Sequence, residues 1–243
     1  MSNYQSSNKV PGFFAPWSMI VMDVPSNFEW QQAAQTMPAR QSGPISGDND
    51  RTQLAAMRPA KLLCESGEYV CLIRDVSEAG VTLGLFHDMP AISHAFLELA
   101  NGEVFPLLGL WAAERQAGFR FTQPLDPAEL IAEPGSFPRR AIRLNIPRSG
   151  MVFADGLLRG INLQDIAQNG ASFTSDTRFA LGQTLVLSLD AIPEMSAWVR
   201  WRRGRAYGLV FDTMLRLDQL AHYALALQPV TSRGHHETVA RVA

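Results

Sequence analysis

The stretch Asp165-Ile-Ala-Gln-Asn-Gly170 is decisive for the fold of this chain, because a second version of it, Asp75-Val-Ser-Glu-Ala-Gly80, lies 90 residues earlier. Another spacing recurs at the same offset: Trp-(x)6-Gly-(x)2-Phe occupies 111–121 and again 201–211. Five identical residues at one fixed offset are hard to obtain by chance. A period this long corresponds to a whole small domain rather than to a solenoid repeat. The sequence therefore predicts two tandem copies of one module.

Composition and charge are those of a soluble globular protein. The 243 residues are 47% hydrophobic and 18% charged, which is typical of a chain that buries a core. The formal net charge of −2 provides no overall attraction to nucleic acid or to an anionic membrane, so recognition of an anion would require a local cluster of arginines. No apolar run approaches the roughly 18 residues that span a bilayer, so we expect a cytoplasmic protein without a membrane span.

The chain divides into two modules between two tails. Residues 1–50 are rich in Ser, Asn, Gln, Pro and Gly, which predicts a flexible N-terminal tail. Short strand patterns separated by glycine turns predict a first small antiparallel barrel over 51–130 and a second over 131–228. Residues 229–243 turn polar and predict a C-terminal tail. The expected fold class is therefore all-β.

Prolines, a helical pattern and two cysteines refine this division. Four prolines between 124 and 138 mark a linker between the modules. Apolar residues over 213–227 recur on one helical face, which predicts an amphipathic helix that closes the second module.

Cys64 and Cys71 flank a predicted turn at 66–68, where they could be cross-strand neighbours. With no further cysteine in the chain, we expect two buried free thiols.

A cluster of arginines begins the second module. Residues 138–148, Pro-Arg-Arg-Ala-Ile-Arg-Leu-Asn-Ile-Pro-Arg, contain four arginines and no acidic residue. The bracketing prolines disfavour a long helix, so we expect an extended arm on which Arg139 and Arg143 project to the same side. Guanidinium groups present a planar fork of donors to phosphate or to guanine, and they stack on purines. A solvated run of charge is the alternative interpretation.

The arginine cluster and the repeated motif together resemble a known family. Arg139-x-x-x-Arg143 followed by Asp165-x-Ala167-x-x-Gly170 is similar to the RxxxR … (D/N)xSxxG pattern of PilZ domains, which are bacterial receptors for cyclic di-GMP. The late hairpin at 201–211 and its earlier copy also resemble this family, so the resemblance covers 51–228. It implies two tandem six-stranded antiparallel barrels that bind cyclic di-GMP without chemistry and without a cofactor.

The resemblance implies a role for each motif residue of the second module. Arg139 and Arg143 would bind phosphate and the O6/N7 edge of guanine or stack on the base, with Arg140 as a third donor. Asp165 would accept hydrogen bonds from guanine N1–H and the exocyclic amine, and Gly170 would let the backbone approach the ligand closely. The alternative for the aspartate and the glycine is a turn in which the glycine takes a positive φ.

The first module departs from the family pattern in its arginines. It keeps Asp75, Ser77 and Gly80 but has no RxxxR, since Arg51 and Arg58 lie seven residues apart. We therefore expect this module to be degenerate and structural. Its residues Arg58, Asp75, Ser77 and Gly80 form at most a weaker site.

The second module departs from the pattern at one position, where Ala167 replaces the family serine. A lost neutral hydrogen bond costs about 0.5–1.5 kcal/mol, whereas each charge-assisted arginine contact is worth about 1.5–3 kcal/mol. The arginines outweigh the serine in this comparison. The second module is therefore predicted to hold the binding site.

The late hairpins of the two modules contain tryptophans, and the second also contains a further group of arginines. Trp111 and Trp201 are predicted to lie in the cores, because Trp201 alternates with Val199 on one strand face. The second group of arginines surrounds a predicted turn at Gly204 and could add positive potential: Arg202, Arg203 and Arg205.

The predicted function is that of a non-catalytic cyclic di-GMP receptor. The sequence shows no nucleophile–base–orienter set, no phosphate-cradling loop and no cluster of metal ligands, so an enzyme is disfavoured and no metal is expected. Ligand binding is expected to order the arm at 139–148 and to alter the angle between the barrels, with a downstream protein as receiver. The alternative is a ligand-free scaffold that binds a protein partner. RNA or single-stranded DNA is a weaker alternative, because the arm contains no aromatic residue for stacking.

Overall fold

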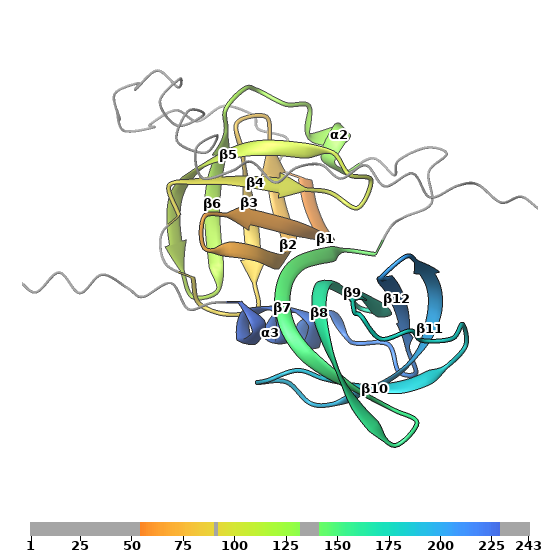
Figure 1. Ribbon diagram of the computed structural model, residues 1–243. Coiled ribbons are helices and arrows are strands. Elements are labelled where there is room, and N and C mark those ends of the chain that lie inside the picture. The colour runs from red at the N-terminus through yellow and green to blue at the C-terminus, as the bar shows by residue number, and fades with distance from the viewer. Residues whose placement is uncertain (1–53, 90–91, 132–140, 229–243) are drawn as a thin grey trace, which may run out of the picture. The chain divides into compact units, whose positions relative to one another are not determined.

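The computed structural model describes residues 54–89, 92–131 and 141–228 (Figure 1). Within these ranges the chain forms two closed antiparallel barrels of six strands each, with a helix after each barrel. The predicted all-β class, with two tandem six-stranded barrels and a C-terminal helix, is confirmed. Several predictions fall outside the described residues: the tails at 1–50 and 229–243, and Arg51, Arg139 and Arg140.

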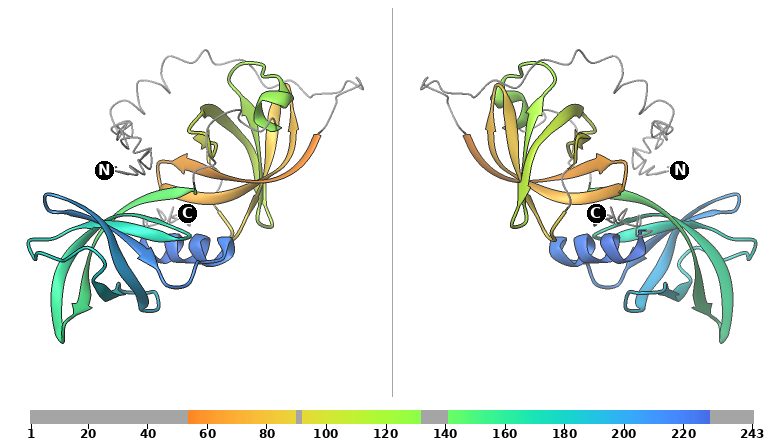
Figure 2. Two further views of the ribbon diagram at one scale, coloured as in Figure 1. Left: turned by 90° about the vertical axis from the view of Figure 1, so that its right-hand side faces the viewer. Right: turned by 90° about the vertical axis from the view of Figure 1, so that its left-hand side faces the viewer.

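The first barrel follows the predicted series of short strands. Its strands are β1 (Leu54–Cys64), β2 (Gly67–Ser77), β3 (Gly80–Leu85), β4 (His94–Glu98), β5 (Val104–Ala113) and β6 (Gln116–Phe121). They close in the order β1-β2-β3-β6-β5-β4, so every strand has two hydrogen-bonded neighbours. Figure 2 shows the strands of each barrel from two further sides. A closed barrel satisfies its backbone donors and acceptors without leaving a free strand edge.

The second barrel repeats this arrangement. Its strands are β7 (Arg143–Ala154), β8 (Leu157–Ala167), β9 (Gly170–Thr174), β10 (Thr184–Ser188), β11 (Met195–Arg203) and β12 (Ala206–Phe211). Their neighbours are those of the first barrel moved by six strands, because the closed order is β10-β11-β12-β9-β8-β7. The helix α3 (Leu217–Leu227) follows and begins four residues later than predicted.

Irregularities of strand pairing are duplicated together with the strands. In the first barrel they fall between Ala55 and Arg58, between Ile73 and Asp75, and between Gly109 and Trp111. In the second they fall between Asn145 and Arg148, between Leu163 and Asp165, and between Val199 and Trp201, each 90 residues later. A bulge changes which side of the strand the following residues face. The repeat therefore includes the positions at which side chains switch faces.

Each barrel has its own hydrophobic core. Phe173, Phe179 and Tyr207 form an aromatic group in the second core, with ring centroids 5.3 to 5.8 Å apart. Helix α3 adds four buried side chains to the same core: Leu220, Ala221, Ala224 and Leu227. Neither helix in the described part of the chain is long and apolar enough to cross a membrane.

The predicted linker between the modules contains a short helix, α2 (Pro127–Ile131). It begins 90 residues before α3, and its Leu130 is fully buried in the first core. The guanidinium of Arg58 donates a hydrogen bond to the carbonyl of Leu130 at 3.1 Å. Its counterpart, Arg148, donates to the carbonyl of Leu227 in α3 at 2.9 Å. Arg58 and Arg148 thus each hold the helix that follows their own barrel.

The two cysteines are buried and free, as predicted, but they are not cross-strand neighbours. The register of β1 and β2 places Cys64 opposite Gly67 and Cys71 opposite Ala60. The turn consists of Glu65 and Ser66 and lies two residues earlier than pairing of Cys64 with Cys71 would require. Burial raises the pKa of both thiols, so both are protonated at neutral pH.

Candidate functional site

Five residues form a row across the outer face of the second barrel. The strand register pairs Asn145 with Asp165, Asp165 with Ser172, Ser172 with Gly208, and Gly208 with Trp201. Cross-strand partners point to the same face of a sheet, so these residues are neighbours although they span 64 positions of the sequence. We call them the outer row.

Two of the predicted site residues meet at one end of the outer row. The guanidinium of Arg143 lies 2.5 Å from Oδ1 of Asp165 and remains half exposed. Ser172 donates its hydroxyl hydrogen bond to Oδ2 of the same carboxylate. Asp165 therefore orients Arg143, while the remaining guanidinium N–H groups stay available as donors on the surface.

Ser172 is a site residue that the sequence analysis missed. The resemblance predicts the family serine at position 167, where Ala167 is buried and pairs with Arg143 across β7 and β8. In the first barrel the serine at the equivalent position, Ser77, donates to the carbonyl of Gly80 at 3.3 Å, which is a local turn contact. A usable signal existed, because Thr82 preserves a hydroxyl 90 residues before Ser172.

The prediction that Trp111 and Trp201 lie in the cores is wrong. Their exposed fractions are 47% and 39%. The bulge between Val199 and Trp201 breaks the alternation, so Val199 remains inside while Trp201 turns to the outer face. The bulge after Gly109 does the same for Trp111.

Each exposed indole lies against a glycine of the neighbouring strand. A Cβ atom added to Gly208 would collide with the ring of Trp201, and one added to Gly118 would collide with the ring of Trp111. These are also cross-strand pairs in the register. The repeated Trp-(x)6-Gly spacing therefore encodes an indole lying over a glycine on the outer face.

The motif glycines Gly80 and Gly170 do not adopt the positive φ of the alternative turn interpretation. A Cβ atom at Gly170 would collide with the carbonyl of Leu209, and one at Gly80 with the carbonyl of Phe119. These residues belong to the adjacent strand of the same barrel. Close approach of two strands requires the glycine in both copies, independently of any ligand.

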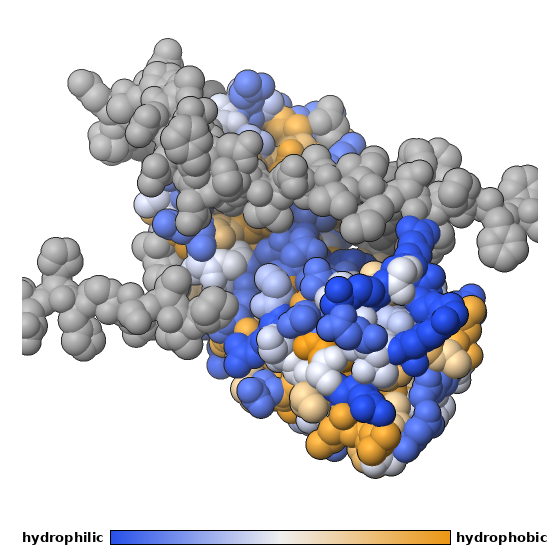
Figure 3. Space-filling view, in the orientation of Figure 1, coloured by the Kyte–Doolittle hydropathy of each residue, from blue (hydrophilic) through white to orange (hydrophobic). Residues whose placement is uncertain are grey.

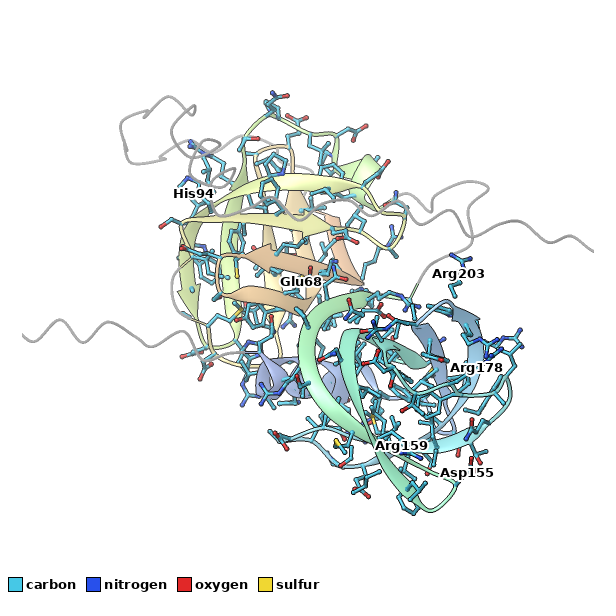
Figure 4. The ribbon with its side chains drawn as sticks, in the orientation of Figure 1. Glu68, His94, Asp155, Arg159, Arg178 and Arg203 are labelled. Carbon is cyan, nitrogen blue, oxygen red and sulfur yellow. The ribbon has the colours of Figure 1, made fainter. Side chains whose placement is uncertain are left out.

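Arginines extend from the tryptophan end of the outer row along β11. The guanidinium of Arg203 lies 5.8 Å from the ring centroid of Trp201, and that of Arg200 lies 5.7 Å from the ring of Trp198. Arg203, labelled in Figure 4, lies where Figure 3 shows strongly hydrophilic surface. The other two arginines of the predicted second group have partners within the barrel: Arg202 with the carbonyl of Phe179 and Arg205 with Asp176.

The first barrel has the same row without the arginines. Asp75 pairs with Thr82, Thr82 with Gly118, and Gly118 with Trp111. The position that corresponds to Arg143 is Gln53, and the counterparts of Arg200, Arg202 and Arg203 are Leu110, Ala112 and Ala113. Arg58, named in the predicted weaker site, donates instead to α2.

The strand that carries Arg143 is tied to the first barrel by buried polar contacts. The carboxylate of Glu68 accepts from the backbone N–H of Asn145 at 2.8 Å and from its side-chain amide at 3.0 Å. Lys61 lies 3.2 Å from Glu68 and 2.8 Å from Glu98, and it donates to the carbonyl of Arg143 at 3.3 Å. Lys61 and Glu68 are both buried, so each charge depends on these partners.

A second buried contact closes the same junction. The side-chain amide of Gln228, directly after α3, accepts from the backbone N–H of Glu68 at 2.6 Å and donates to its carbonyl at 2.9 Å.

Within the described residues no group of three or more His, Cys, Asp and Glu side chains is placed to hold a metal ion. The chemistry available on the outer row is thus hydrogen bonding, charge and aromatic stacking.

Comparison with known proteins identifies the domain that carries this row. Residues 137–226 match the PilZ domain family. No curated protein matched the chain. Among solved structures, PlzA of Borreliella burgdorferi in complex with c-di-GMP is 11% identical over 70% of this chain and 88% of that chain, with a TM-score of 0.32. YcgR of Escherichia coli in complex with c-di-GMP is 12% identical over 70% and 82%, with a TM-score of 0.29. MotI/DgrA, an inhibitor of motility from Bacillus subtilis, is 12% identical over 71% and 96%, with a TM-score of 0.31. The match to the PilZ domain family is therefore confined to the part of the chain that contains the second barrel.

Proposed function

We propose that this protein is a non-catalytic receptor that binds cyclic di-GMP on the outer row of its second barrel. The observation that carries the proposal is the contact of Arg143 with Asp165, in the same row as the exposed ring of Trp201. These groups supply a cation, an acceptor and an aromatic face within one PilZ domain. A guanine nucleotide can interact with all three, through its phosphate, its N1–H edge and its ring face.

The groups of the outer row match the chemistry of guanine and phosphate. Asp165 accepts from guanine N1–H and the exocyclic amine, while Arg143 donates to O6/N7 or to a phosphate. Trp201 provides the stacking surface, and stacking of a base on an aromatic ring is worth about 1–3 kcal/mol. Arg139 and Arg140 precede Arg143 in the same motif and contribute further donors to the phosphates.

Loss of the family serine weakens this site only slightly. Ser77, at the equivalent position of the first barrel, donates its hydroxyl hydrogen bond to the carbonyl of Gly80, which is a turn contact. Ala167 therefore removes a local hydrogen bond, worth about 0.5–1.5 kcal/mol. Ser172 supplies a hydroxyl directly on Asp165.

The buried junction provides the route by which ligand binding reaches the first barrel. Lys61 binds the carbonyl of Arg143, and Glu68 binds Asn145 two residues further along β7. A displacement of Arg143 toward a ligand strains both contacts, and the two barrels then change their relative orientation. A downstream protein reads that change.

One observation favours a second candidate function, a scaffold that binds a protein partner without a nucleotide. Both carboxylate oxygens of Asp165 already have partners within the barrel, Arg143 and Ser172. When an acceptor already has hydrogen-bond partners in the free protein, a ligand that bonds to it contributes less net binding free energy. The titration described next separates the two functions.

Isothermal titration of cyclic di-GMP into the full chain tests the proposal. We expect binding that falls at least about 100-fold in the Arg139→Ala/Arg143→Ala variant, because two charge-assisted contacts of about 1.5–3 kcal/mol are lost. Arg120→Ala, which removes an exposed arginine from the first barrel, is the matched control and should bind like the natural protein. Absence of binding by all three proteins, at two temperatures, would favour the scaffold. Unchanged binding by the double variant would place the ligand away from the outer row.

A further inference from the structure

Tryptophans and arginines alternate along the outer face of β11 in the second barrel. Trp198 precedes the buried Val199, and after the bulge Trp201 lies on the outside as well. The guanidinium of Arg200 lies 5.7 Å from the ring centroid of Trp198. That of Arg203 lies 5.8 Å from the ring of Trp201, so both arginines share the face of the tryptophans (Figure 4). We call these four residues the β11 strip.

Positive charge is concentrated at the β11 strip. Residues 200–205 read Arg-Trp-Arg-Arg-Gly-Arg, which is four arginines in six positions without an acidic residue. The residues that the strand register places opposite the strip are uncharged: Val210, Gly208 and Ala206 on β12, and Thr184 on β10. No cross-strand neighbour therefore neutralises the charge of the strip.

The first barrel shows that the β11 strip is not required to close the fold. The positions 90 residues before the strip are occupied by Leu108, Leu110, Trp111 and Ala113. This copy has the same strand order and the same bulge, with one aromatic residue and no arginine. The second barrel therefore adds a tryptophan and two arginines to a surface whose strand pairing does not depend on them.

We propose that the β11 strip binds single-stranded nucleic acid. Trp198 and Trp201 stack on unpaired bases, and Arg200 and Arg203 contact the phosphates between them. Aromatic rings interleaved with cations on the face of a small barrel are the combination that binds single strands with little sequence preference, because every base has a ring face. A duplex offers mainly the edges of its paired bases, so stacking favours the single strand. The arm at 139–148 contains no aromatic residue for such stacking, whereas the strip contains two.

Fluorescence anisotropy tests the proposal with labelled oligothymidylate and oligouridylate of about 12 nucleotides, a length within the site sizes of small barrels. The full chain is titrated to about 100 μM at low salt without cyclic di-GMP, since non-specific binding falls in the micromolar range. We expect Trp198→Ala to weaken binding at least about fivefold and Trp198→Phe to retain most of it, because a ring remains. Trp111→Ala removes an exposed indole from the first barrel and is the matched control.

The same variants separate this function from the binding of cyclic di-GMP. Trp198 lies outside the outer row, so Trp198→Ala should leave the affinity for cyclic di-GMP unchanged. Circular dichroism checks that each variant is folded. A natural protein that binds neither oligonucleotide, or a Trp198→Ala variant that binds both like the natural protein, would overturn the proposal.

Salt dependence tests the arginines of the strip. Each phosphate contact to a single strand contributes about 0.7 to the slope of log K against log salt concentration, so Arg200→Ala/Arg203→Ala should lower the slope by about 1.4. Arg74→Ala/Arg120→Ala removes the same charge from exposed positions of the first barrel and should preserve the slope. An unchanged slope in the strip variant would contradict the phosphate contacts. Equal affinity for a duplex of the same length, or binding to phosphatidylglycerol vesicles in place of oligonucleotides, would overturn the assignment to a single strand.

Discussion

The two barrels share a backbone and differ in charge. Both have the same strand order, the same three bulges and a tryptophan over a cross-strand glycine. In the second barrel arginines surround that tryptophan, whereas the first has Leu110, Ala112 and Ala113 at the corresponding positions. The shared features are those that close the barrel, and the features that differ are those that would bind an anion. The fold of the module therefore does not depend on the charges that its outer face carries.

The equivalent hairpins of the two barrels likewise share a backbone position and differ in the chemistry of their side chains. In the first barrel the β1–β2 hairpin carries a buried ion pair, Lys61 with Glu68, and contacts the second barrel. In the second barrel the equivalent residues are apolar and partly exposed, Met151 and Leu158. The repeat thus preserves the position of a contact surface and changes its chemistry.

The largest expected effect comes from breaking the buried pair in the first hairpin. Glu68→Ala removes one of the two carboxylates beside Lys61 and the acceptor of both Asn145 hydrogen bonds. It should lower the free energy of unfolding by about 3 kcal/mol, measured by urea denaturation. Glu98→Ala, which removes the more exposed partner of Lys61, should cost about 1 kcal/mol. Leu158→Ala, at the equivalent position of the second barrel, should cost less than either. Equal losses for Glu68→Ala and Leu158→Ala would contradict the distinction between the hairpins.

Thiol labelling can report on the first barrel alone, because both cysteines lie there. Burial raises the pKa of Cys64 and Cys71, so the reactive thiolate is scarce at neutral pH and becomes available only above the raised pKa or on opening of the barrel. We expect labelling of the native protein to be slower than that of the unfolded chain by on the order of 100-fold. Glu68→Ala should accelerate it. Rapid labelling of the natural protein would show that the first barrel opens readily.

The two tryptophans should respond differently to the same substitution. Trp201→Ala is expected to weaken cyclic di-GMP binding about tenfold through loss of one stacked base, as measured by titration calorimetry. Trp111→Ala should leave the affinity unchanged, because no arginine of the described chain accompanies it in the outer row of the first barrel. A loss of affinity in both variants would mean that the first barrel also contacts the ligand.

The smallest expected effect concerns the motif serine, which the first barrel has and the second lacks. Ala167→Ser can form the turn contact that Ser77 makes with Gly80, and should raise the free energy of unfolding by at most about 1 kcal/mol. The affinity for cyclic di-GMP should change less than about threefold. Ser77→Ala should lower the stability by a similar amount. An increase in affinity of an order of magnitude with Ala167→Ser would show that the serine reaches the ligand.

The geometry of the candidate site could be predicted in part from local patterns. Arg143 and Asp165 were identified from a motif, and they do lie in contact. Ser172 was missed, because its contact with Asp165 depends on how β8 pairs with β9 and not on a spacing within one segment. The helix α2 was missed because its prolines indicate a linker, and only the burial of Leu130 and its contact with Arg58 reveal a packed turn.

The sequence by itself determined that the protein consists of two copies of an antiparallel barrel and that the arginines belong to the second. These properties can be inferred from the composition, from the glycine turns and from the constant offset of 90 residues between the two copies. Only the tertiary structure decided that Trp201 faces outward, that Ser172 meets Asp165, and that Glu68 holds the strand of Arg143. These features depend on bulges and on pairing between distant segments. A bulge of one residue reverses the face of every side chain after it, so alternation along one strand could not reveal them.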